Sequence, residues 1–413
     1  MVPNSLALIG SKLTTLGSGF VFWLLAARLF EPAEVGLGAA VVSAMLLCCQ
    51  LALLGAGSAV IKLFGAHADR PGVLTNAALT IVVVASAVVG GLFVAVSGSG
   101  LLSQLDVVAE PGYALLFVAA TLTGTAGAVL DQTSTALRRG DQALVRGVVF
   151  GLGSIATLCV LVASGADGWA PIFAPWLAAG ALVLTVGVAQ FRRALPGYRL
   201  RPSSDWPLLR GVARVGMRNH LLTLAERAPQ LLLPILVAEL LSPGDNAAWY
   251  VAWMTAWVVF IVPVQVGMTA FAEAAREPGR LDAVVRQGLR TSLAIGVPGA
   301  AVAALLAGPL LPLLGDTYAD EGTAPLRVLL LAVVPLCFTY AYYSACRAIG
   351  RIAQATALAW TTAAVGVAAA TIAGASSGLT AMAAGWAATQ FVAALWSGWR
   401  LRALVRDLGA AAS

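Results

Sequence analysis

Twelve stretches of about 20 or more mostly apolar residues follow one another along the 413-residue chain. A helix needs about 20 such residues to cross the hydrocarbon core of a bilayer. The stretches cover approximately residues 5–28, 35–61, 76–97, 112–137, 143–164, 168–191, 219–241, 247–271, 291–314, 325–346, 352–374 and 378–399. Only 11% of the residues are charged, whereas soluble domains carry about 25%. The sequence therefore predicts an all-α polytopic membrane protein with about twelve transmembrane helices.

The intervals between these stretches are too short for a soluble catalytic domain. The longest polar interval runs from Arg192 to Arg218, and no segment shows the alternating pattern of barrel strands. No GxxxxGK[ST] phosphate-binding motif occurs, and the five cysteines show no CxxC spacing. The first stretch is too long for a secretory signal, so we expect an uncleaved helix. We expect no cofactor, no metal site and no enzymatic activity.

The distribution of basic residues predicts the orientation of the chain. The even-numbered loops and the C-terminal tail hold 21 of the 25 lysines and arginines, whereas the odd-numbered loops collect acids. Cytoplasmic loops carry such an excess of positive charge. We therefore expect a multi-pass protein of the bacterial plasma membrane with both termini in the cytoplasm. The basic residues are spread loop by loop, so no nucleic-acid partner is expected.

An internal repeat divides the chain into halves. The end of the first span, residues 27–32, matches residues 238–243 at an offset of 211, and the turns at residues 139–141 and 349–351 match at an offset of 210. An even number of spans per copy keeps both copies in the same orientation, as in parallel transporter repeats. We predict two six-helix lobes, residues 1–200 and 201–413.

Three segments resemble a known family. Residues 28–36, 219–273 and 314–329 are similar to the oligosaccharide and polysaccharide flippases of the multidrug, oligosaccharidyl-lipid and polysaccharide exporter (MOP) superfamily. The resemblance covers essentially the whole chain. It implies two lobes around a central cavity, lined largely by the first two helices of each lobe. It also implies export of a lipid-linked sugar by alternating access.

Four ionisable side chains stand out well inside the predicted spans, where each costs roughly 2.5–3.5 kcal/mol and usually faces a cavity or a partner. These are Lys12, Asp131, Glu226 and Arg227. Lys12 and Arg227 occupy the first span of each half at a similar depth, about 10–13 Å from the predicted cytoplasmic ends. We predict a substrate-binding site of these four residues, in which the two cations hold a diphosphate head group. In the structural alternative, Lys12 snorkels to the surface and Glu226 or Asp131 neutralises Arg227.

Two prolines in the seventh span are candidate hinges. Pro229 and Pro234 each remove a backbone donor and favour a kink. The span can bend there during opening and closing, or the kink can be a static feature of packing. The sequence leaves both interpretations open.

The leading functional hypothesis is a flippase that moves a polyprenyl-diphosphate-linked oligosaccharide for cell-surface polysaccharide synthesis. The alternative is a cation-coupled multidrug antiporter of the same superfamily, in which Asp131 or Glu226 is the coupling acid. A membrane glycosyltransferase or sugar polymerase is disfavoured because the outer loops are short. The expected partners are the lipid-linked oligosaccharide, membrane lipids and other polysaccharide-assembly proteins, and we expect a monomer.

Overall fold

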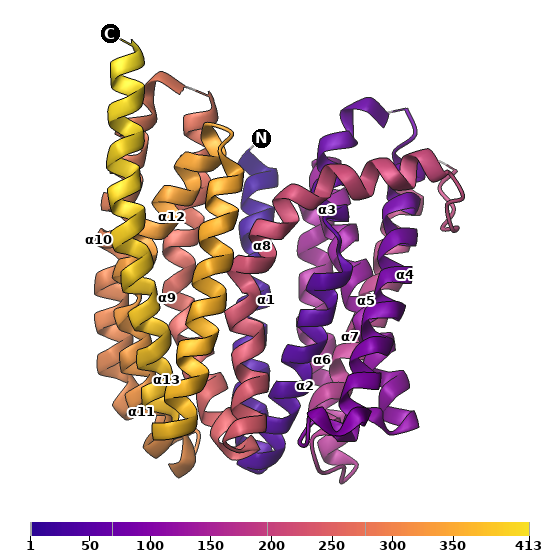
Figure 1. Ribbon diagram of the computed structural model, residues 1–413. Helices are drawn as coiled ribbons and strands as arrows, with labels where there is room; N and C mark the ends of the chain where they lie inside the picture. The colour runs from indigo at the N-terminus through magenta and orange to yellow at the C-terminus, as the bar shows by residue number, and fades with distance from the viewer. Residues whose placement is uncertain (1, 68, 196, 277, 413) are drawn as a thin grey trace. The chain divides into compact units, whose positions relative to one another are not determined.

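A computed structural model describes residues 2–67, 69–195, 197–276 and 278–412. Within these ranges the chain consists of helices and short connections, and no strand occurs. The helices form two compact units, residues 1–224 and 225–413 (Figure 1). The all-α fold predicted from the sequence is confirmed.

Unit 1 contains seven complete helices and the first part of an eighth. They are α1 (Val2–Leu29), α2 (Pro32–Ala52), α3 (Ala56–Leu63), α4 (Pro71–Val96), α5 (Pro111–Ala136), α6 (Gly140–Ala163), α7 (Ala170–Ala194) and the start of α8 (Trp206–Leu240). Helix α6 packs on α1 and α7, and α5 packs on α2, α4 and α7. The short helices are η1 (Gly65–His67), η2 (Ser97–Leu101) and η3 (Asp106–Ala109).

Unit 2 continues from within α8. It adds α9 (Pro243–Arg276), α10 (Leu281–Leu310), α11 (Asp316–Leu331), α12 (Val333–Ala348) and α13 (Ile352–Ala412), with the short helices η4 (Pro278–Arg280) and η5 (Leu311–Leu313). Helix α9 packs on α10, α11 and α12, and α13 packs on α11 and α12.

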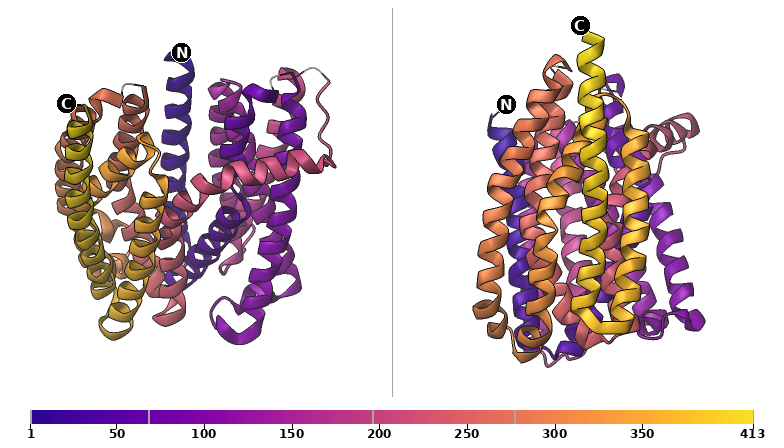
Figure 2. Two further views of the ribbon diagram at one scale, coloured as in Figure 1. Left: turned by 45° about the horizontal axis from the view of Figure 1, so that its top comes forward. Right: turned by 60° about the vertical axis from the view of Figure 1, so that its left-hand side comes forward.

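The division between the units falls inside α8, between Leu224 and Ala225, whereas the sequence predicted a boundary after residue 200. The first turns of α8 belong to unit 1 because they bury apolar side chains there. Val212 is fully buried in a cluster with Tyr198, and Leu208 packs against the same cluster. This part of α8 runs crosswise to the neighbouring helices of unit 1 (Figures 1 and 2).

Proline and turn residues explain where several helices begin. Pro32, Pro71 and Pro111 each stand in the first turn of their helix. Proline suits this position because the amide hydrogen that it lacks would have no partner within the helix. At α2 the Glu34 carboxylate also accepts a hydrogen bond from the Glu31 amide, which completes a capping box.

Every predicted span corresponds to a helix, a helix pair or half of a broken helix. In the described part of the chain nine helices are long and apolar enough to cross a membrane, or ten if the bent pair α11 and α12 is one span. One of these helices, α13, contains both of the last two predicted spans. The first span is α1, of which the residues described with their side chains include the apolar segment Gly17–Leu29.

Helix α13 is a hairpin, because Ser377 and Gly378 leave the helical conformation. The two halves then lie against each other. A Cβ atom on Gly374 would touch Met382, and one on Gly385 would lie 2.7 Å from the Ala369 carbonyl oxygen. Figure 2 (right) shows the two yellow halves side by side. The predicted separation into spans 352–374 and 378–399 is therefore correct.

Two predicted spans are not continuous helices. The span predicted at 35–61 is divided into α2 and α3 by Leu54 and Gly55, whose φ angles are 44° and 75°. The span predicted at 325–346 bends by 43° between α11 and α12. Pro335 lies near the start of α12, where its ring cannot continue the hydrogen-bond ladder from α11.

The break at Gly55 brings two backbones into contact. A Cβ atom on Gly216 of α8 would collide with the carbonyl oxygen of Gly55, and one on Gly55 would collide with the backbone of Gly216. No flexible side chain could move aside at this point. The α2–α3 break and the crosswise part of α8 are therefore fixed against each other within unit 1.

Gly216→Ala should lower the free energy of unfolding by about 1–3 kcal/mol, because the new methyl group forces two backbones apart. Gly211→Ala is the matched control on the same helix, since a Cβ atom there meets no atom within 4 Å. We expect this control to stabilise the helix by about 0.5–1 kcal/mol. Thermal unfolding of the purified proteins in detergent measures both. Equal midpoints for Gly216→Ala and the wild type would contradict the close contact.

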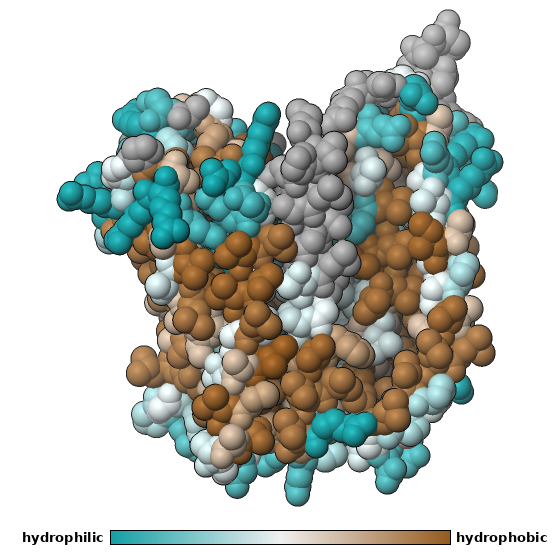
Figure 3. All heavy atoms as spheres, turned by 180° about the vertical axis from the view of Figure 1, so that it is seen from behind, coloured by the Kyte–Doolittle hydropathy of each residue, from teal (hydrophilic) through white to brown (hydrophobic). Residues whose placement is uncertain are grey.

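The surface of the helices suits a bilayer. On the face shown in Figure 3, hydrophobic side chains cover the middle of the helices and hydrophilic side chains gather at their ends. Many of the exposed apolar residues lie on membrane-length helices, for example Leu92, Leu152 and Ile372. Contact between these apolar side chains and lipid chains costs no free energy, whereas their exposure to water would. The chain is thus built as a multi-pass membrane protein.

Candidate functional site

The structure describes three of the four candidate ionisable side chains. Asp131 lies on α5, and Glu226 and Arg227 are adjacent on α8. Lys12 belongs to α1, but its side chain lies outside the described part of the structure.

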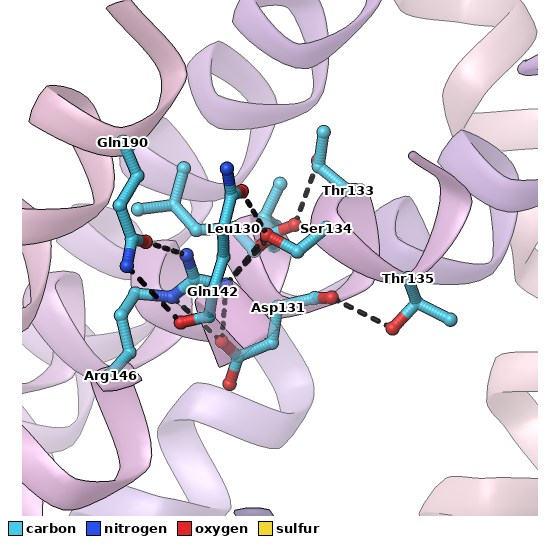
Figure 4. Close-up of polar contacts among 9 residues, drawn as sticks. Leu130, Asp131, Thr133, Ser134, Thr135, Gln142, Arg146 and Gln190 are labelled. Carbon is cyan, nitrogen blue, oxygen red and sulfur yellow. Dashed lines mark hydrogen bonds and ion pairs between the residues drawn. The ribbon is translucent and has the colours of Figure 1, made fainter. Parts of the chain in front are cut away.

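Asp131 belongs to a polar cluster around Arg146 of α6 (Figure 4). The Arg146 guanidinium donates hydrogen bonds to Asp131 Oδ1 at 2.9 Å, Gln190 Oε1 at 2.5 Å, the Leu130 carbonyl oxygen at 3.1 Å and Ser134 Oγ at 2.9 Å. Ser134 in turn donates to Gln142 at 3.2 Å. The Arg146 side chain is 1% exposed. The cluster thus satisfies a buried cation with acceptors from α5 and α7.

The two members of the ion pair differ in exposure. Arg146 Nη2 lies 2.8 Å from Asp131 Oδ1, but the Asp131 side chain is 52% exposed. The guanidinium also lies 5.9 Å from the centre of the Phe191 ring, within the range of a cation–π contact. Arg146 is therefore the structural centre of the cluster, whereas Asp131 lies at its edge.

Glu226 forms the corresponding ion pair of unit 2, with Arg347 at the end of α12. Arg347 Nη2 donates to both carboxylate oxygens of Glu226, at 2.9 and 3.2 Å. The two side chains are 14% and 11% exposed. The pair joins two helices that are far apart in sequence, and both charges are largely removed from solvent.

Aromatic side chains surround the small cavity beside Glu226. The cavity measures about 50 Å³, and its wall includes Trp253, Trp257, Phe260, Tyr340 and Trp386 together with Gln230 and Gln390. A water molecule occupies about 30 Å³ in the liquid. The cavity thus has room for one or two waters and is too small for a sugar or a drug. The buried indole nitrogens of Trp253 and Trp386 have no hydrogen-bond partner among the described residues, and such waters could accept from them.

Arg227 differs from its neighbour Glu226. Its side chain is exposed, and it makes no hydrogen bond or ion pair with another described residue. Adjacent residues on a helix point about 100° apart, but the charge of Arg227 still acts on the Glu226 carboxylate that holds Arg347. Asp131 and Glu226 form their ion pairs with other arginines, Arg146 and Arg347. The structural alternative, in which Glu226 or Asp131 neutralises Arg227, stays a prediction.

Both predicted hinge residues lie inside α8, which is helical from Trp206 to Leu240. Pro229 is buried and belongs to the wall of the cavity beside Glu226. A hinge motion is recognised by comparing two conformations of a protein, and the structure describes one. Bending at Pro229 and Pro234 therefore stays a prediction.

Sequence reasoning missed the two arginines that hold the acids. A signal for Arg146 was present, because Asp131 and Arg146 lie at nearly equal distances from the turn between α5 and α6. An antiparallel hairpin places such residues opposite each other. Arg347 offered no comparable signal, because 121 residues separate it from Glu226.

No protein-family model and no curated protein matches the chain. A MATE family multidrug resistance transporter of the MOP superfamily, in an inward-facing conformation, aligns with a TM-score of 0.72 and 16% identity over 97% of this chain and 96% of its own. The lipid II flippase MurJ, in an inward closed conformation, aligns with a TM-score of 0.72 and 11% identity over 97% and 88%.

A third solved structure, a variant of the Vibrio cholerae MATE transporter VcmN, aligns with a TM-score of 0.63 and 13% identity over 98% of this chain and 99% of its own. These similarities define the fold, which the chain shares with solved MATE transporters and with the flippase MurJ. More particularly, the chain has the fold of the MOP superfamily, as the sequence resemblance implied.

Proposed function

We propose that this chain is a flippase that moves a polyprenyl-diphosphate-linked oligosaccharide across the plasma membrane by alternating access. Two independent lines support the proposal. Three sequence segments resemble the oligosaccharide and polysaccharide flippases, and the fold is shared with a protein described as a lipid II flippase. The saccharide and its lipid carrier belong to the proposal, since the fold is equally that of multidrug transporters.

The observation that carries the proposal is the balance of charge among the intramembrane candidates. Asp131 and Glu226 each form an ion pair with an arginine of their own unit, whereas Arg227 forms none with a described residue. Glu226, Arg227 and Arg347 together therefore carry one excess positive charge. An unpaired cation at bilayer depth costs roughly 2.5–3.5 kcal/mol. An anionic substrate group would remove this cost. Diphosphate oxygens would also accept charge-assisted hydrogen bonds worth about 1.5–3 kcal/mol each.

A cation-coupled multidrug antiporter is the second candidate, and the fold shared with MATE transporters favours it. Its coupling acid would have to be Asp131 or Glu226. A proton or metal cation would then compete with a guanidinium that already holds the carboxylate at 2.8–2.9 Å. The arrangement of charges therefore supports the flippase over the antiporter.

Arg227→Ala should reduce export by at least about tenfold, which corresponds to the loss of one charge-assisted hydrogen bond. The measurement is the amount of lipid-linked saccharide accessible at the outer leaflet in a deletion strain that carries each variant. Arg227→Lys should retain part of the export, because the charge is kept.

Arg214→Ala is the control for this experiment. It removes the same charge from an exposed position of α8, in the part that belongs to unit 1. Size-exclusion profiles establish that each variant is folded. Wild-type export by a folded Arg227→Ala protein would rule out the cationic site.

A further inference from the structure

An open groove runs along the last turns of α7 within unit 1. Its volume is about 590 Å³. Leu184, Val188, Ala189 and Leu200 form its apolar wall, and Arg192 and Arg193 lie at one end. The residues of α7 that line the groove form two rows at intervals of four, 184–188–192 and 185–189–193, and therefore share one face of the helix. Each row, its arginine included, extends over about 12 Å. The groove thus combines a long apolar surface with a doubly charged end.

The segment that forms the other wall is held in place by α4. Tyr198 donates to Asn76 Oδ1 at 3.0 Å, and Asn76 donates to the Arg199 carbonyl oxygen at 2.9 Å. The Ser203 amide donates to Thr80 at 2.9 Å. Burial raises the pKa of Tyr198 to about 12, so its hydroxyl remains a donor at physiological pH. Leu200 lies between these anchors, and the groove is therefore preformed.

The charged end of the groove lacks an internal counter-charge. None of the residues that line the groove is acidic. Arg192 and Arg193 are both exposed, and neither forms an ion pair with a described acidic side chain. They occupy the last turn of α7, where a membrane-spanning helix reaches the lipid head groups. The excess of lysine and arginine in the even-numbered loops predicts that this end of α7 faces the cytoplasm.

We propose that this groove binds an anionic phospholipid of the surrounding bilayer. An acyl chain would lie along the apolar wall, and the phosphate would accept hydrogen bonds from Arg192 and Arg193. A free phosphate ion would leave the apolar wall unused, and a zwitterionic lipid would bring the cation of its own head group close to the two arginines. The site lies wholly within unit 1 and is separate from Arg227 in unit 2.

Native mass spectrometry of the full-length protein tests this site, with phosphatidylglycerol and phosphatidylcholine of equal chain length as probes. The wild type should retain phosphatidylglycerol preferentially. The double variant Arg192→Gln/Arg193→Gln should lose about tenfold or more of that preference, because each basic residue near an anionic surface contributes substantially to attraction. Ala189→Trp should weaken retention without a change of charge, because the indole fills the groove.

The matched control is Arg210→Gln/Arg214→Gln, which removes two exposed arginines of unit 1 that do not line the groove. This variant should retain phosphatidylglycerol as the wild type does, and excess inorganic phosphate should not displace the lipid. Three results would each overturn the proposal. The first is equal retention of the two lipids by the wild type. The second is a loss of preference in Arg210→Gln/Arg214→Gln as large as that in Arg192→Gln/Arg193→Gln. The third is wild-type retention of phosphatidylglycerol by Ala189→Trp. Circular dichroism establishes that each variant is folded.

Discussion

Arg146→Met is expected to lower the free energy of unfolding by about 3–5 kcal/mol, the usual effect of removing one partner of a buried charged pair. The guanidinium is 1% exposed and binds acceptors on α5 and α7. Methionine fills much of the same volume but leaves those acceptors without a donor. Thermal or denaturant unfolding of the purified protein in detergent measures the loss.

Two further variants separate this structural role from other effects of charge. Asp131→Asn should cost less, about 1.5–3 kcal/mol. The buried guanidinium loses its counter-charge, but the amide oxygen still accepts from it, and it keeps its other acceptors, Gln190, Leu130 and Ser134. Arg139→Met should have little effect, since Arg139 and its partner Asp141 are 51% and 64% exposed. If Arg146→Met were as stable as the wild type but failed to export, the cluster would belong to the transport site.

The order of the helices could be predicted from the sequence because it depends on local properties. Apolar length determines which segments can span a bilayer, and the loop arginines predict their direction. Breaks inside spans are harder to predict. Gly55 is one of 43 glycines, and only its contact with Gly216 shows why the chain must change direction there. That contact joins residues 161 positions apart, from 55 to 216.

The candidate site was predicted less completely, because ionic partners depend on tertiary packing. The four intramembrane charges were visible as exceptions in apolar stretches, but a sequence does not state which cation faces which acid. The α5–α6 hairpin would have identified Arg146 as the partner of Asp131, since the two residues flank one turn. Glu226 and Arg347 meet only because the second part of α8 packs with α12 in unit 2.

The ion pair of unit 2 provides the sharpest distinction between the two proposed functions. Glu226→Gln and Arg347→Gln, each alone, should lower the free energy of unfolding by about 3–5 kcal/mol, because each leaves a buried charge without its partner. The double variant should recover most of that loss, because no charge remains and the two amides can bind each other. A double-mutant cycle on unfolding free energies in detergent measures the coupling.

Transport by the double variant then decides the role of Glu226. If the pair is structural, the folded Glu226→Gln/Arg347→Gln protein should export lipid-linked saccharide, because Arg227 is unchanged. An antiporter that uses Glu226 as its coupling acid would instead lose cation-dependent drug efflux in both Glu226→Gln and the folded double variant. The decisive result would be drug efflux that depends on a cation gradient in the wild type and is absent from the double variant. That result would contradict the flippase hypothesis and support the antiporter. If the double variant neither exports nor transports drugs, although it is folded, Glu226 or Arg347 acts in transport itself.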